Sequence, residues 1–228
     1  MPAANVIQLR QLLKEKMPAL RLSLEELPSQ RLNHWPTGLP QIDEPLHGGL
    51  PKGALTEMVA VQRGSGSALL RNALLARAAR EKQIVALIDG NDSLDVTAMA
   101  ETVLSRLIWV RCHSAEESLK AADLLLRDRN VPLVFLDLIS NPAAQIRRIP
   151  ATTWFRFQRI VEQSSTVCLA LTPQPMISPA HARITLMPRR FSLNALEREP
   201  EELLAELSLE VSDARRSREL NERLRHSA

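Results

Sequence analysis

Two glycines and two serines lie where an apolar run that predicts a strand meets a run that predicts a helix: Gly64, Ser65, Gly66 and Ser67. Small residues at such a junction let successive backbone N–H groups point at a phosphate. The complete pattern is G-x-x-x-x-G-K-[ST], in which the lysine neutralises the phosphate and the hydroxyl binds magnesium. On residues 60–67 only Ser67 fits, because Ala60 and Ser65 replace the glycines and Gly66 replaces the lysine.

The absent lysine weakens any phosphate chemistry at this junction. No lysine lies between Lys52 and Lys82, so shifting the alignment by one residue does not restore it. Losing one charge-assisted contact weakens binding by about 1.5–3 kcal/mol. We therefore expect a strand-to-helix turn that binds nucleotide poorly. In the alternative, Arg63 or Arg71 takes the place of the lysine, although a planar guanidinium needs a different pose.

Strand-like and helix-like segments alternate after residue 54, and they predict the elements that hold this loop. Five apolar runs predict strands, at 55–61, 84–89, 107–111, 132–137 and 166–171. The stretches between them predict helices, at 67–81, 95–104, 116–128 and 151–163. Strands this apolar are typical of a parallel sheet with helices on both faces. Two further alternating segments predict antiparallel edge strands, at 182–187 and 207–211.

Three segments in this order resemble the core of the RecA recombinase: GGLPKGALTEMVAVQRGSGSALL, IVALIDGNDSLD and PLVFLDL. The resemblance covers residues 36–187 and implies an α/β fold, a RecA-like P-loop NTPase core with a mostly parallel sheet. A closer resemblance is to the ImuA family, also called SulA-like, whose members are short RecA-like proteins. It rests on WPTGLPQIDEPLHGGLPKGALTEMV and RLIWVRCHSAEESLKAADLLLRDRNVPLVFLDL.

The ImuA resemblance implies an accessory role in SOS-induced, error-prone translesion DNA synthesis. The partners that it implies are an inactive Y-family polymerase-like subunit, an error-prone replicative-type DNA polymerase and RecA. Two other classes of function stay open: a divergent DNA-dependent ATPase of DNA repair, and a SulA-like inhibitor of cell division. No residue of this chain points to a surface for a division protein.

The RecA resemblance also implies where catalytic groups would lie. The second strand of such a core ends in an acidic signature whose glutamate activates water. The matching residue is Asn91, whose amide cannot accept the proton. Asp137 matches the Walker B aspartate, although an acid at a strand end is more often a cap or turn residue. With the lysine and glycines also absent, we expect no catalytic residue, no enzyme activity, and neither ATP nor magnesium as a cofactor.

Three regions make up the expected organisation of the chain. Residues 1–30 form an N-terminal helical extension, residues 31–211 the RecA-like core, and residues 212–228 an arginine-rich, partly disordered tail. Apolar residues recur at helical spacing between positions 5 and 18. RecA-type proteins join neighbouring protomers through an N-terminal helix, so docking of residues 5–18 on RecA is a hypothesis that follows from the resemblance.

Arginines supply two candidate contacts with DNA. By the RecA resemblance, the first DNA loop corresponds to residues 140–153, which contain Arg147 and Arg148, and a second, short loop to residues 172–183. The tail adds another cluster: Arg215, Arg216 and Arg218. Such side chains contact phosphates, in an interaction that weakens with salt. The alternative is a solvated basic turn, and the net charge of +3 is too mild to decide between them.

The cysteines, histidines and tryptophans are expected to have structural roles. Cys112 and Cys168 lie in or beside apolar runs, so we expect buried, reduced thiols. His34 and His113 match no triad or metal spacing, so we expect no metal site. The tryptophans are expected core or interface anchors: Trp35, Trp109 and Trp154. The sequence has no visible signal peptide or membrane-spanning run, so we expect a cytoplasmic protein.

Overall fold

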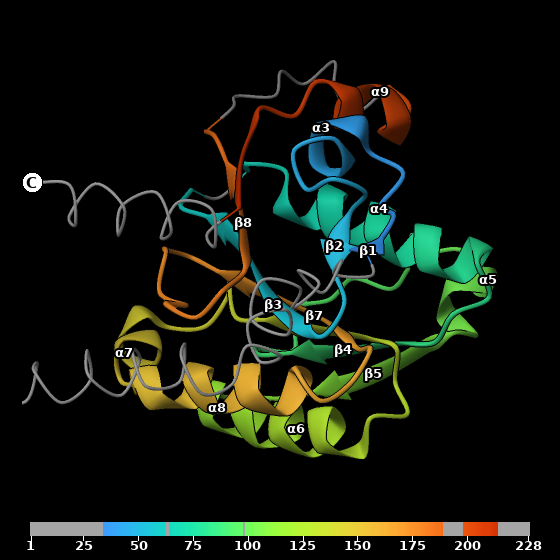
Figure 1. Cartoon of the computed structure of the whole chain (residues 1–228). Helices are drawn as coiled ribbons and strands as arrows, with labels where there is room; N and C mark the ends of the chain where they lie inside the picture. Colours follow the sequence, from blue (N-terminus) through green and yellow to red (C-terminus); the bar gives the residue numbers. More distant parts are fainter. Residues whose placement is uncertain (1–33, 63, 98, 189–197, 214–228) are drawn as a thin grey trace, which may run out of the picture. The chain divides into compact units, whose positions relative to one another are not determined.

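A seven-stranded sheet forms the centre of the fold (Figure 1). The computed structural model describes residues 34–62, 64–97, 99–188 and 198–213. The strand order is β5-β4-β6-β7-β3-β8-β9, and every neighbouring pair is parallel except β8 with β9. The strands are β3 (Ala54–Ala60), β4 (Val85–Asp89), β5 (Leu107–Arg111), β6 (Leu133–Asp137), β7 (Val167–Thr172), β8 (Ala182–Leu186) and β9 (Leu209–Asp213).

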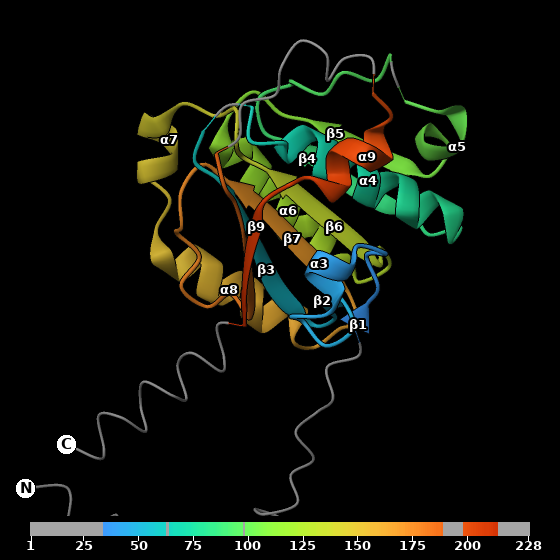
Figure 2. The ribbon, with the colours of Figure 1, turned by 90° about the horizontal axis from the view of Figure 1, so that it is seen from above.

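Helices cover both faces of this sheet, as Figures 1 and 2 show. One face packs against α3 (Pro40–Asp43), α4 (Ser67–Arg80), α5 (Glu101–Leu104) and α9 (Pro200–Ala205). The other face packs against α6 (Ala115–Asp128), α7 (Ala143–Arg147) and α8 (Ala151–Val161). The four central strands β3, β4, β6 and β7 are buried along their whole length, because helices exclude water from both of their faces.

A short antiparallel pair, β1 (His34–Trp35) and β2 (Leu50–Pro51), leads the chain into β3. Gly49 has a φ of 119°, and a Cβ at this position would overlap the backbone of Trp35. Only glycine fits this turn without strain. The Trp35 side chain is buried, and its indole N–H donates to Glu81 and to Gln83, the latter at 2.7 Å. The pair therefore anchors the lead-in segment beside the end of α4.

The five strands that the sequence predicts from apolar runs are confirmed as β3, β4, β5, β6 and β7, with ends that differ by one residue at most. The predicted helices at 67–81, 116–128 and 151–163 are also confirmed, within two residues. The predicted helix at 95–104 is wrong in its first half, because only Glu101–Leu104 is helical. Asp95 accepts hydrogen bonds from the backbone N–H and the hydroxyl of Thr97, and this turn competes with a helix.

The prediction that residues 182–187 form an edge strand is wrong. This segment is β8, which pairs in parallel with β3 on one side and antiparallel with β9 on the other. Its alternating pattern reflects the partial exposure of Arg183 and Thr185. The second predicted edge strand is confirmed as β9, although it spans residues 209–213 instead of 207–211.

Several expectations concern residues that the structure does not describe. The N-terminal extension, Arg63 and the tail arginines 215, 216 and 218 fall outside the described residues.

Trp35 and Trp154 lie in the core, whereas Trp109 is half-buried on β5. Both cysteines are buried thiols, as expected, and burial raises the pKa of Cys168 to about 12. Among the described residues, no helix is long and apolar enough to cross a membrane.

Candidate functional site

The loop between β3 and α4 is the turn that the sequence predicts. Gly64 and Gly66 have φ values of 79° and 90°, in the left-handed region that favours glycine. Gly66 caps α4 without any side-chain hydrogen bond to the first turn. Ser65 between them is buried, and its hydroxyl has no hydrogen-bond partner. Two left-handed glycines thus form the turn from β3 into α4, at the position where the phosphate-loop pattern has its lysine and glycine.

The side chain of Leu207 covers this loop. Leu207 lies between α9 and β9 and is only 5% exposed. A Cβ built on Gly66 would overlap one of its methyl groups. Gly66 is the position of the lysine in the phosphate-loop pattern, so an apolar side chain fills the space that a lysine would cross. The segment that carries Leu207 is attached to the rest of the fold at Leu204. The side chain of Leu204 is buried, and the Gln41 side chain donates a hydrogen bond to the Leu204 carbonyl.

Restoring the lysine should therefore destabilise the protein. We expect Gly66→Lys to lower the free energy of unfolding by about 1–3 kcal/mol through overpacking against Leu207, in addition to strain from the left-handed φ. Gly64→Lys is the matched control, because its φ is similar and nothing lies within 4 Å of its Cβ. Urea unfolding of both variants measures the difference. Equal losses in the two variants would show that Leu207 does not block this position.

A buried ion pair occupies the end of β6. The Arg71 guanidinium on α4 donates to Asp137 at 2.7 Å, and the two residues are 9% and 6% exposed. Burial raises the pKa of Asp137, and the charge of Arg71 opposes this rise. Arg71 is thus engaged with Asp137, whereas the sequence suggested it as a substitute for the phosphate-loop lysine. These residues do not fit a magnesium-bound nucleotide, because the carboxylate that would serve the metal already binds a guanidinium.

The residues at the end of β4 also form hydrogen bonds within the protein. Asp89 is buried and accepts from the backbone N–H groups of Ser93 and Leu94, so it organises the loop that follows. The amide of Asn141 donates to the carbonyl of Gly90 at 2.6 Å, and a Cβ on Gly90 would overlap the Asn141 side chain. Asn91, which matches the catalytic glutamate of RecA-like cores, is exposed beside this contact.

The neighbouring acid, Asp92, is also engaged. Its two carboxylate oxygens accept from Arg111 at 2.7 Å each, and this hydrogen bonding lowers the pKa of Asp92. The Arg111 guanidinium lies 4.9 Å from the centre of the Trp109 ring. Asp89, Asp92 and Asp137 therefore each accept hydrogen bonds from other groups of the protein.

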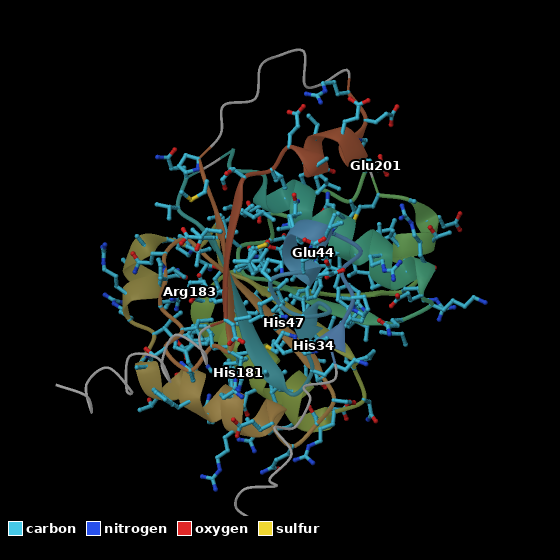
Figure 3. The ribbon with its side chains drawn as sticks, turned by 45° about the horizontal axis from the view of Figure 1, so that its top comes forward. His34, Glu44, His47, His181, Arg183 and Glu201 are labelled. Carbon is cyan, nitrogen blue, oxygen red and sulfur yellow. The ribbon has the colours of Figure 1, made fainter. Side chains whose placement is uncertain are left out.

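The segment that matches the second DNA loop is fixed to the sheet by a buried carboxylate. Glu57 on β3 is fully buried and accepts from the hydroxyl of Thr172 and the backbone N–H groups of Met176 and Ile177. Its second oxygen accepts from Arg183 on β8 at 2.7 Å, and Figure 3 labels this arginine. Interactions of this kind leave the loop little freedom to follow a nucleic-acid strand.

The arginines of the first candidate DNA loop, unlike Arg183, are exposed to solvent. Arg147 ends α7, Arg148 follows it, and both are exposed. No ion pair to either side chain occurs among the described residues. The two expected loops thus differ, since residues 140–153 present exposed cations whereas the arginine of residues 172–183 is held by Glu57.

The sequence analysis did not identify three residues that make the contacts described above: Leu207, Asn141 and Glu57. Leu207 and Asn141 gave no local signal, because their partners lie far away in the chain. Glu57 did give one, as a lone charge within the apolar run ALTEMVA. A charge inside a strand that is buried on both faces needs a partner, so it could have marked the ion pair with Arg183. His34 is half-buried and His113 exposed. No group of acids, histidines and cysteines in the described part of the chain could hold a metal ion.

The mostly parallel sheet, its strand order and the loop from β3 to α4 define an α/β protein with a RecA-like core. Solved structures agree with this class. The RadB recombinase superposes with a TM-score of 0.50 at 16% sequence identity, over 67% of this chain and 84% of the RadB chain. This likeness shows the fold.

At the level of sequence, the chain is 27% identical to the RecA protein of Thermus thermophilus, and equally so to RecA from two individual strains of that organism, over 130 residues. The match covers 55% of this chain but only 38% of the length of RecA. No family model matches the chain. The comparisons thus support a relationship to recombinases of the RecA type.

Proposed function

We propose that this chain is a non-catalytic, RecA-like accessory subunit for SOS-induced, error-prone translesion DNA synthesis. The ion pair between Arg71 and Asp137 carries the non-catalytic part of the proposal. It places a guanidinium on the carboxylate that matches the Walker B aspartate, at 2.7 Å. Leu207 supports the same conclusion, because protein atoms fill the position of the phosphate-binding lysine.

The translesion part of the proposal rests on the resemblance to the ImuA family. Its partners would be an inactive Y-family polymerase-like subunit, an error-prone replicative-type polymerase and RecA. The chain would act through protein contacts and, at exposed arginines such as Arg147 and Arg148, through contact with DNA phosphates. Residues 5–18 would dock on RecA through their apolar face.

A nucleotide titration tests the non-catalytic part. We expect no binding of labelled ATP with magnesium at micromolar protein, and no release of phosphate above the background rate. The alternative, a divergent DNA-dependent ATPase, requires binding in this range and turnover that disappears in Asp137→Ala. Because that variant breaks a buried ion pair, Ser67→Ala is the second variant, since it leaves the pair intact.

Co-purification tests the partner assignment. The tagged full-length chain, recovered from cells after DNA damage, should bring down RecA and the polymerase-like subunit. Deletion of residues 1–18 should remove RecA from this complex. If every interaction survived the deletion, the N-terminal segment would not be the docking helix. If neither partner were recovered with the intact chain, the translesion role itself would be wrong.

A further inference from the structure

A basic pocket lies near the carboxyl ends of α6 and α8, on the face of the sheet opposite to α4. Its volume is about 360 Å³. Its lining, as far as the structure describes the chain, contains four arginines and no acidic residue: Arg127, Arg129, Arg156, Arg159, Ile160 and Gln163. Four arginines from two helices and the segment after α6 thus line one hollow. Neither the degenerate nucleotide loop nor the expected DNA loops include it.

The positive charge of this pocket is only partly neutralised. Asp123 on α6 pairs with Arg127 at 2.7 Å and with Arg156 at 3.1 Å, so one carboxylate serves two arginines. Arg129 donates to the neutral side chain of Gln163 at 2.7 Å. Arg159 is exposed and has no ion pair among the described residues. The four arginines outnumber the acids around them, which are Asp123 and the exposed neighbours Asp128 and Glu162.

The second feature of this pocket is the left-handed backbone conformation of Arg129. Arg129 follows the last residue of α6 with a φ of 60°, in the left-handed region. Helices commonly end in this conformation with glycine, and a side chain there is less favourable by about 1–2 kcal/mol. The dipole of α6 favours cations near its end. That effect does not explain Arg156, which lies in the middle of α8.

We propose that this pocket binds the phosphates of a nucleic-acid backbone. The planar fork of arginine matches phosphate oxygens two at a time, and four forks at one hollow suit a multiply charged ligand. Ile160 is the only apolar residue in the lining, which gives a peptide side chain little to pack against. Two adjacent hollows continue along the helices to Arg148, and their linings mix the cations Lys120 and Arg148 with the acid Glu116, which pairs with Lys120. The inference goes beyond the accessory role proposed above and does not depend on it.

Fluorescence anisotropy with the full-length chain tests this pocket. The probes are a labelled DNA duplex of about 20 base pairs, a single strand of the same length, and inorganic tripolyphosphate as a competitor. We expect Arg129→Gly and Arg159→Ala each to weaken binding of at least one DNA probe about two- to tenfold. The slope of log affinity against log salt should fall by about 1 for each arginine removed. Arg80→Ala, an exposed cation on α4, is the control and should change neither quantity.

The Arg129→Gly variant separates binding from folding. Glycine suits the left-handed backbone, so its thermal unfolding should occur at the same temperature as that of the unaltered protein or higher. Weaker binding without loss of stability supports the pocket. If calorimetric titration showed tripolyphosphate binding that depends on Arg129 and Arg159 while neither DNA probe bound, the pocket would bind phosphate but not nucleic acid, and the proposal would be wrong. Unchanged DNA affinity in both variants, or equal weakening by Arg80→Ala, would overturn the proposal.

Discussion

Replacing Arg71 with alanine is expected to lower the free energy of unfolding by about 3–5 kcal/mol, because it leaves the Asp137 carboxylate buried without its partner. Arg71 and Asp137 are 9% and 6% exposed, so water cannot solvate the charge that remains. For a chain of this size the midpoint of thermal unfolding should fall by roughly 6–20 °C. Calorimetry and urea unfolding measure both quantities. A loss below about 1 kcal/mol would mean that the pair is not buried as described.

The effect of Arg71→Ala should also depend on pH. Burial raises the pKa of Asp137 in the folded protein, and removing Arg71 raises it further. An acid whose folded pKa lies above its unfolded value takes up a proton on folding in the pH range between the two values. Its contribution to stability therefore improves as the pH falls from the folded pKa towards about 4. The deficit of Arg71→Ala should be smaller at about pH 5 than at about pH 8.

The double variant Arg71→Met/Asp137→Leu is the matched control for the ion pair. Replacing both charges with apolar side chains removes the need for a partner, and such replacements are commonly neutral or stabilising. We expect the double variant to be more stable than Arg71→Ala by about 3 kcal/mol or more. A double variant as unstable as the single one would show that packing, and not the charge of Asp137, causes the loss.

Glu57→Ala should have an effect of similar size through a different network. Glu57 is fully buried, and its removal leaves the Arg183 guanidinium and three neutral donors without their acceptor. We expect a loss of about 3–5 kcal/mol in the free energy of unfolding. The loss should be accompanied by faster hydrogen exchange at the amides of Met176 and Ile177, which donate to this carboxylate.

Arg183→Met provides the control for the Glu57 network. Arg183 is partly exposed, with 30% of its side chain accessible, and the three neutral donors still reach Glu57 in this variant. We expect a smaller loss than in Glu57→Ala, with the amides of Met176 and Ile177 still protected. If both amides exchanged as fast in the unaltered protein as in Glu57→Ala, the carboxylate would not be what fixes this loop.

Much of the fold followed from local patterns. The central strands are continuous apolar runs such as ALTEMVA and PLVFLD, and a run of this kind is typical of a strand buried on both faces of a parallel sheet. The failures also have local causes. The turn at Asp95 uses side-chain hydrogen bonds that helix periodicity does not reveal. The alternation in β8 resembles an edge strand because Arg183 faces Glu57 and not the apolar core.

By itself, the sequence predicted a glycine-rich turn without a lysine between a strand and a helix, and the RecA resemblance placed Asn91 at the position of an acid. It could not determine what fills the loop. Arg71 meets Asp137 across 66 residues, and Gly66 meets Leu207 from beyond β8. Such contacts depend on the crossovers that bring β6, α4 and the segment before β9 together. Periodicity describes which face of an element is apolar, whereas only tertiary packing selects the partner of each buried side chain.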